Sequence, residues 1–144
     1  MPTPNHPKVG VGVLLVDESG RLLLTLRLRP PEAGSWSIVG GKLDFLETLE
    51  QCAVRETFEE VGAAISIDSL LCVTDHLVPD EGQHWVSPAF LARVSSLDTR
   101  NCEPEKTQEV RWFPLDNLPV NLTITAHNAI EAYKRKSPQG PTPL

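Results

Sequence analysis

Three glutamates and an arginine stand close together near the middle of the chain: Arg55, Glu56, Glu59 and Glu60. In a helix, which turns by about 100° per residue, Glu60 lies about 40° from Glu56 on one side and Glu59 about 60° on the other. The three carboxylates therefore share one face. Oxygen-only ligands of this kind suit Mg²⁺, for which Mn²⁺ can substitute, and leave positions for water and phosphate oxygens.

This arrangement breaks several local rules at once. Like charges three and four residues apart repel each other, and acids near the C-terminal end of a helix oppose its macrodipole. Such conflicts tend to occur at functional sites, and a divalent cation would resolve them. The alternative is an ordinary solvated acidic face with Arg55 in a surface ion pair, because charge runs are usually solvated.

The helix that carries these acids has clear end signals. Thr48 and Gln51 form a capping-box pattern, residues 49–61 contain no Gly or Pro, and Gly62 supplies the residue that ends the helix. Gly40-Gly41, just before the helix, allows backbone conformations with positive φ and the close approach of a ligand. The side opposite the acids collects apolar residues that we expect to face the core: Val54, Phe58 and Val61.

Alternation and apolar runs predict the other elements. Strands are expected over 9–16, 21–28, 36–39, 65–77, 84–94 and 109–113, and a second helix over 123–135. The first two strands read as a hairpin around the turn at 17–20. Strands followed by a helix, then strands and a second helix, indicate a mixed α/β sandwich.

Seven residues at fixed spacing carry a resemblance to the Nudix superfamily. The Nudix box reads G-x5-E-x7-R-E-U-x-E-E-x-G-U, where U is a bulky aliphatic residue, and residues 41–63 read GKLDFLETLEQCAVRETFEEVGA. The matching residues are Gly41, Glu47, Arg55, Glu56, Glu59, Glu60 and Gly62. Thr57 and Ala63 stand at the two U positions, and Val39 replaces the proline often found before the Gly-Gly pair.

Three further stretches look like successive landmarks of MutT-like members: GVGVLLVDESGRLLLTLR, GSWSIVGGK and EVRWFPLDNLP. The resemblance therefore covers roughly residues 8–135. It implies the Nudix α/β/α sandwich, with a mixed central sheet, a smaller antiparallel sheet and flanking helices. We therefore expect an irregular segment over 1–7, one Nudix hydrolase domain over 8–136, and a disordered tail over 137–144, which is rich in Pro and Gly.

The resemblance also implies roles for individual residues. Glu56, Glu59 and Glu60 would be metal ligands, with the backbone carbonyl of Gly41 near the metal. Glu47 and Arg55, with Gly40 and Gly62, would hold the loop and orient the carboxylates. Arg27 matches a position that contacts substrate phosphate, and Trp36-Ser37 lies where MutT-like enzymes line the base pocket. By spacing alone, Arg27 could equally be a surface arginine at a strand end.

The implied reaction is Mg²⁺-dependent hydrolysis of a nucleoside triphosphate, including damaged or non-canonical ones, to the monophosphate and pyrophosphate. Glu56 or Glu59 could be the general base, or a glutamate from a distant loop, for which Glu105 is preferred over Glu103 and Glu109. ADP-ribose or another nucleoside diphosphate sugar is the alternative substrate. A non-catalytic nucleotide-sensing domain on the same scaffold is the alternative of another class.

The composition of the chain disfavours several classes of binding partner. A net charge of −6 disfavours a general nucleic-acid binder, because backbone binding depends on Lys and Arg. No apolar run approaches the length of a membrane helix, and the N-terminus lacks the pattern of a secretory signal. Three cysteines without a CxxC pair predict reduced thiols in the cytoplasm. We expect a small-molecule nucleotide as partner, and the resemblance allows a homodimer.

Overall fold

A computed structural model describes residues 5–136 of the chain. Its strands are β1 (Lys8–Val16), β2 (Leu22–Arg27), β3 (Trp36–Ser37), β4 (Val39–Lys42), β5 (Ile67–Val78), β6 (Gln83–Arg93) and β7 (Thr107–Phe113). Its helices are α1 (Leu49–Val61) and α2 (Ile124–Lys136), with short 3-10 turns η1 (Pro79–Glu81) and η2 (Ser96–Asp98). The predicted order is confirmed with one difference: the single strand expected over 36–39 is two strands, β3 and β4, and β4 continues to Lys42. Most other boundaries are shifted by one or two residues.

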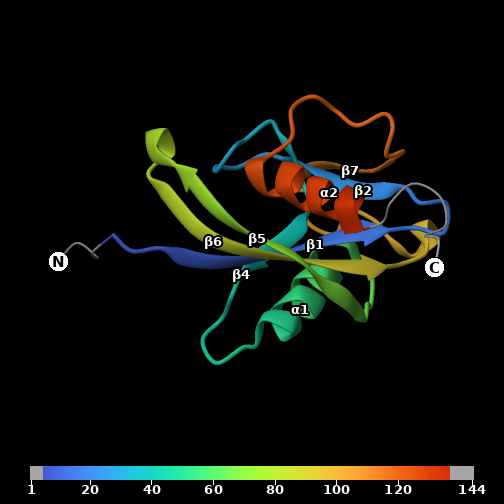
Figure 1. The fold of residues 1–144 in the computed structure, drawn as a ribbon, viewed down its shortest axis with the longest axis horizontal. Helices are drawn as coiled ribbons and strands as arrows, with labels where there is room; N and C mark the ends of the chain where they lie inside the picture. Colours follow the sequence, from blue (N-terminus) through green and yellow to red (C-terminus); the bar gives the residue numbers. More distant parts are fainter. Residues whose placement is uncertain (1–4, 137–144) are drawn as a thin grey trace.

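The strands form one branched, seven-stranded sheet. Its main path is β3-β2-β1-β6-β5, with β4 paired to β1 and β7 paired to β2. β1 and β6 are parallel, and all other pairs are antiparallel. Figure 1 shows α1 on one face of the sheet and α2 on the opposite face. The expected mixed α/β sandwich is therefore present. The expected smaller antiparallel sheet is not separate, because its strands β2, β3 and β7 join the main sheet through the pairing of β2 with β1.

The predicted hairpin of the first two strands is wrong in its pairing. β1 and β2 share a single register pair, Val16↔Leu22, next to the turn. Beyond that point β1 pairs with β6 and β4, whereas β2 pairs with β7 and β3. The two strands separate because each has longer pairings elsewhere, and β4 takes the place beside β1 that β2 leaves.

Each face of the sheet packs against its own helix. Alternate residues of β1 point to opposite faces, so Val11 and Val13 join the cluster under α1, and Leu14 and Val16 join the cluster under α2. Both clusters are built from buried hydrophobic side chains, and burial of this apolar surface is the main stabilising term. β1 thus holds the two helices in a fixed relation across the sheet.

Helix α1 begins and ends as its end signals predict. The Thr48 side chain accepts a hydrogen bond from the Gln51 backbone N–H, and the Gln51 side chain accepts one from the Thr48 N–H, which completes the capping box. Gly62 ends the helix at φ 78°, and its N–H donates to the carbonyl of Phe58. Both ends of the acid-bearing segment are therefore fixed by local chemistry.

The predicted apolar face of α1 is partly wrong. Val54 is 38% exposed and Phe58 is 61% exposed. The residues that face the sheet are smaller ones: Cys52, Ala53, Thr57 and Val61. Small side chains let the helix approach the sheet closely. Thr57 tolerates burial because its hydroxyl donates to the Ala53 carbonyl over 2.7 Å.

Residues 1–4 and the predicted disordered tail, 137–144, lie outside the described residues. Among the residues that are described, no helix is long and apolar enough to cross a membrane.

Candidate active site

Gly40 and Gly41 bring the backbone of β4 against α1. Contrary to expectation they lie within a strand, and neither has a positive φ. Their lack of a side chain serves close packing instead. A Cβ on Gly41 would lie 2.2 Å from the Glu56 carboxyl carbon, and a Cβ on Gly40 would lie 2.2 Å from the Val11 carbonyl oxygen. Only glycine at position 41 leaves room for the Glu56 carboxylate.

Arg55 binds several of the acids at once. Its Nε and Nη2 donate to the Glu47 carboxylate over 2.6 and 2.9 Å. Its Nη1 donates to Glu56 Oε1 over 2.8 Å and to Glu59 Oε2 over 3.2 Å. These bonds lower the pKa of Glu47 to about 2 and raise the pKa of Arg55. These hydrogen bonds fit the expected role of Glu47 and Arg55, which is to orient the carboxylates of Glu56 and Glu59.

Glu60 points away from Arg55 and toward the strand. Its Oε2 accepts a hydrogen bond from the Gly40 N–H over 2.9 Å. Burial raises the pKa of Glu60 to about 8, and burial also raises the pKa of Glu56, with smaller effects from the neighbouring charges of Glu59 and Glu103. The site therefore crowds and desolvates anionic groups.

A loop bound to the end of α1 adds a fourth acid. The Arg100 N–H donates to the Val61 carbonyl and the Cys102 N–H donates to the Glu60 carbonyl, each over 3.0 Å. This places the charge of Glu103 near Glu56 and Glu60, where it raises the pKa of both.

Glu105 lies two residues further on, in an exposed turn. The structure thus brings Glu103 to the site rather than the preferred Glu105. Nothing local in the sequence separates the two residues, because the difference comes from the bonds between this loop and α1.

The donor set at this site is made of oxygens. Glu56, Glu59, Glu60 and the carbonyl of Gly41 fit a hard divalent cation, which would offset the repulsion among desolvated carboxylates. Within residues 5–136, no three His, Cys, Asp or Glu side chains are already arranged to hold a metal ion. Arg55 instead engages Glu56 and Glu59. The chemistry of the residues fits the ion, and their side chains would need to turn to bind it.

An open cavity borders this acid-bearing region on the α2 side of the sheet. Gly40, Gly41 and Lys42 form one border, and Arg27 lines the cavity as well. Arg27 Nε donates to the Pro31 carbonyl over 2.7 Å and its Nη2 to the Pro30 carbonyl over 3.2 Å. Burial lowers the pKa of Arg27. The guanidinium is held in place by the loop after β2.

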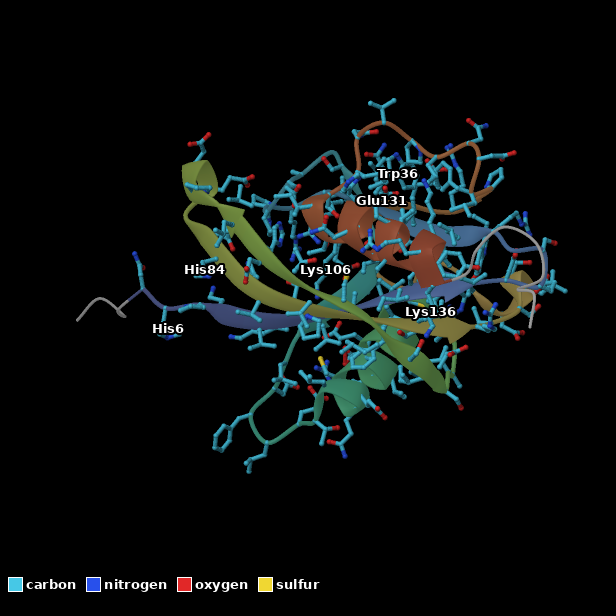
Figure 2. All side chains as sticks on the ribbon, viewed as in Figure 1. His6, Trp36, His84, Lys106, Glu131 and Lys136 are labelled. Atoms are coloured by element: carbon cyan, nitrogen blue, oxygen red, sulfur yellow. The ribbon has the colours of Figure 1, made fainter. Side chains whose placement is uncertain are left out.

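Trp36 and Ser37 take different positions. Trp36 is only 7% exposed and packs edge-on against Phe113 at 4.9 Å between ring centroids. Figure 2 shows it on the α2 side of the sheet, and it belongs to the core cluster there. Ser37 lines the cavity and accepts a hydrogen bond from Thr123. The tryptophan that lines the cavity is Trp85.

Glu32 joins three elements at the mouth of this cavity. His76 Nε2 donates to Glu32 Oε1 over 2.6 Å, and the Ile124 N–H at the start of α2 donates to Glu32 Oε2 over 3.1 Å. Glu32 also has a positive φ of 59°. Sequence reasoning missed Glu32, since its partners are far along the chain. A carboxylate at a helix N-terminus is favourable.

Replacing Glu32 by alanine should therefore lower the stability of the fold. The change leaves the buried His76 ring and a helix N–H without their acceptor, so we expect the free energy of unfolding to fall by about 1–3 kcal/mol. Urea denaturation measures this. Glu105→Ala, in an exposed turn, is the control and should change little. Equal stability of the two variants would show that this junction contributes nothing.

Comparisons with known proteins agree with this geometry. A family model described as the NUDIX domain matches residues 6–135. An oxidized purine nucleoside triphosphate hydrolase of Danio rerio is 33% identical over 111 residues, which is 76% of this chain and 68% of that protein. An ADP-ribose pyrophosphatase of Methanocaldococcus jannaschii is 31% identical over 130 residues, 90% of this chain and 75% of that protein.

A solved structure of a Nudix hydrolase is also similar to this chain. The crystal structure of a MutT NUDIX hydrolase from Burkholderia pseudomallei is 44% identical with a TM-score of 0.83, and the match covers 89% of this chain and 98% of that one. The family model, the relatives and the fold all indicate a Nudix hydrolase. The chain belongs to the Nudix family of hydrolases, MutT-like enzymes that act on phosphorus-containing acid anhydrides and generally need divalent metal ions.

Proposed function

We propose that this protein is a Mg²⁺-dependent pyrophosphohydrolase that converts a nucleoside triphosphate, including damaged ones, to the monophosphate and pyrophosphate. The observation that carries the proposal is the position of the carboxylate cluster, which contacts the Gly40-Gly41 border of a cavity that Arg27 also lines. Anions at one border and a fixed guanidinium nearby suit a polyphosphate held through a cation. The oxidized purine nucleoside triphosphate hydrolase among the relatives supports this substrate class.

Glu56, Glu59, Glu60 and the Gly41 carbonyl would hold Mg²⁺. When bound, the ion supplies neutralisation of phosphate charge and a lower pKa for a water molecule. Because Arg55 bonds both Glu56 and Glu59, it orients the two carboxylates that the ion would share. Glu47 in turn fixes Arg55 through two hydrogen bonds.

Side chains of the protein would bind the substrate and accept the proton of the attacking water. Arg27 binds oxygens of the polyphosphate. The oxygen of a water molecule forms a new bond to phosphorus as the anhydride P–O bond breaks, and pyrophosphate leaves with the electron pair of that bond. A carboxylate accepts the proton of the water, and Glu56, Glu59 and Glu103 are the acids that the structure offers for this role.

Hydrolysis of ADP-ribose is the second candidate. The observation that favours it is the ADP-ribose pyrophosphatase relative, which matches 90% of this chain. Both reactions would use the same carboxylates. They differ in whether pyrophosphate or ribose 5-phosphate is the leaving product.

A substrate panel tests the proposal. Nucleoside triphosphates, damaged triphosphates and nucleotide sugars are incubated with the protein, with Mg²⁺ and with a chelator, and the products are separated. We expect pyrophosphate and the monophosphate from triphosphates, only with Mg²⁺. AMP and ribose 5-phosphate as the dominant products would establish the second candidate. Nucleotide-induced thermal stabilisation without turnover of any compound would instead identify a nucleotide sensor.

A further inference from the structure

The side chain of Arg27 is held by the loop that follows it, residues 28–35. Its guanidinium donates to three successive backbone carbonyls, at residues 29–31. The shortest of these bonds, 2.7 Å, joins Nε to the Pro31 carbonyl. Within the described part of the chain Nη1 has no acceptor, so this nitrogen is available to a ligand in the cavity that Arg27 lines. The position of Arg27 therefore depends on the position of the loop carbonyls.

The peptide group between Pro31 and Glu32 is bonded on both sides. Its oxygen is the Pro31 carbonyl that accepts the bond from Arg27, and its N–H, which belongs to Glu32, donates to Glu81 Oε2 over 3.2 Å. A peptide group is planar, so its C=O and its N–H cannot turn independently. Glu81 lies in η1, at the tip of the β5–β6 hairpin. A contact with this tip therefore helps to fix the carbonyl that holds Arg27.

The side chain of Glu32 holds the same peptide group from the inside of the fold. His76 donates to one carboxylate oxygen of Glu32, and the first N–H of α2 donates to the other. His76 is only 6% exposed, so its ring has little freedom to move. In Figure 1 the loop after β2 lies between the hairpin tip and the start of α2. Glu32 keeps its rare positive φ because these contacts impose it.

The charges around Arg27 place it between two groups of acids. Burial lowers the pKa of Arg27, and the charges of Glu60, Glu32 and Glu81 act in the opposite direction. Glu60 belongs to the carboxylate cluster on α1, whereas Glu32 and Glu81 belong to the contacts that hold the loop. The guanidinium thus stands beside the carboxylates proposed to bind Mg²⁺, and the loop contacts fix it there.

We infer that His76 and Glu32 are positioning residues for substrate binding, which hold the loop so that its carbonyls present Arg27 to the polyphosphate. His76 fixes the Glu32 side chain, Glu32 fixes its own peptide group, and the Pro31 carbonyl of that group fixes Arg27. Neither positioning residue has to touch the substrate. The inference rests on the proposed function, because it takes the polyphosphate as the ligand of Arg27.

A double-mutant cycle between His76 and Arg27 tests this chain of contacts. His76→Leu removes the donor to Glu32, and we expect it to raise KM for a nucleoside triphosphate by about three- to tenfold, with kcat within about threefold. Arg27→Ala should raise KM by about tenfold or more. Adding His76→Leu to Arg27→Ala should change KM no further, because the loop then has no guanidinium to position. Independent, multiplying effects of the two changes on KM would overturn the inference.

Two further variants exclude a purely structural effect of the leucine. His76→Gln offers an amide N–H in place of Nε2, and it should keep KM within about twofold of the wild type. Glu32→Gln keeps the size of the side chain but gives one of its two donors an NH₂ group to face. It should raise KM by about threefold, only where Arg27 is present, and it carries the same cycle if His76→Leu does not fold.

His84→Leu is the matched control for the histidine change. His84 lies on the same hairpin, opposite Leu77 in β5, and is exposed. This variant should keep the wild-type KM. Thermal unfolding establishes the temperature at which every variant is folded, and all assays are run below it.

A binding measurement separates failure of this inference from failure of the proposed function. The Kd of α,β-methylene adenosine triphosphate, which resists cleavage, is measured by calorimetry with Mg²⁺. The same non-additive pattern in Kd supports the inference even for a protein that hydrolyses no triphosphate. If the wild type hydrolyses triphosphates but His76→Leu keeps both KM and Kd, the inference is wrong while the proposed function stands. No binding by the wild type at millimolar analogue overturns the inference as well.

Discussion

Replacing Glu56 by glutamine is expected to lower kcat by about 10²–10⁴-fold with nucleotide and Mg²⁺ at saturation. Glutamine keeps the size of the side chain under Gly41 but removes its negative charge and its capacity to accept a proton. The fold should persist, because the amide oxygen can still accept the hydrogen bond from Arg55 Nη1. Release of pyrophosphate measures the rate, and thermal unfolding confirms that the variant is folded.

Glu50→Gln is the control for this change, because Glu50 is an exposed acid in the first turn of the same helix. It should retain wild-type turnover. Glu59→Gln and Glu60→Gln should both be impaired, and Glu103→Gln should lose more activity than Glu105→Gln. Near-wild-type, Mg²⁺-dependent turnover in the glutamine variants of Glu56, Glu59 and Glu60 alike would refute the carboxylate mechanism.

Alanine at Gly41 should have the second large effect on activity. The added Cβ would meet the Glu56 carboxyl group at 2.2 Å, so this carboxylate must move. Misplacement of a catalytic group by about 1 Å costs about 10²-fold in rate, and we expect a loss of that order in kcat. The contact is with the end of a flexible side chain, so the variant should fold and its melting temperature should change little.

Alanine at Gly40 should act on stability instead. Its Cβ would meet the backbone oxygen of Val11 at 2.2 Å, and a paired strand cannot turn aside as a side chain can. Overpacking of this kind costs about 1–3 kcal/mol or more in free energy of unfolding. Lys42→Ala, at an exposed position of the same strand, is the control. Two neighbouring glycine variants with the same loss of stability and of rate would contradict this division.

Local chemistry explains why α1 was predictable. Its capping box and its terminal glycine depend on residues within four positions of each other, and both are present as predicted. The set of acids follows from the fixed spacing of Arg55, Glu56, Glu59 and Glu60 on that helix. Which face of α1 is buried was not predictable from apolar residues alone, because close approach to the sheet selected Cys52 and Ala53 over Val54 and Phe58.

Features that depend on long-range contacts were harder to predict. Trp36 and Trp85 look alike in a sequence, and only the pairing of β6 with β1 places Trp85 at the cavity. Glu103 reaches the site because its loop bonds to the end of α1. Glu32 joins His76 and Ile124, 44 and 92 positions away in the chain. The secondary-structure propensities of neighbouring residues contain no information about contacts between residues this far apart in the sequence.

Arg55 has a further consequence for how the enzyme matures. Its guanidinium acts as a resident counter-ion for Glu47, Glu56 and Glu59, so the chain can complete its fold before any external cation arrives. A divalent ion bound as proposed would replace the guanidinium at Glu56 and Glu59 on a scaffold that is already folded. Assembly and activation would then be separate steps.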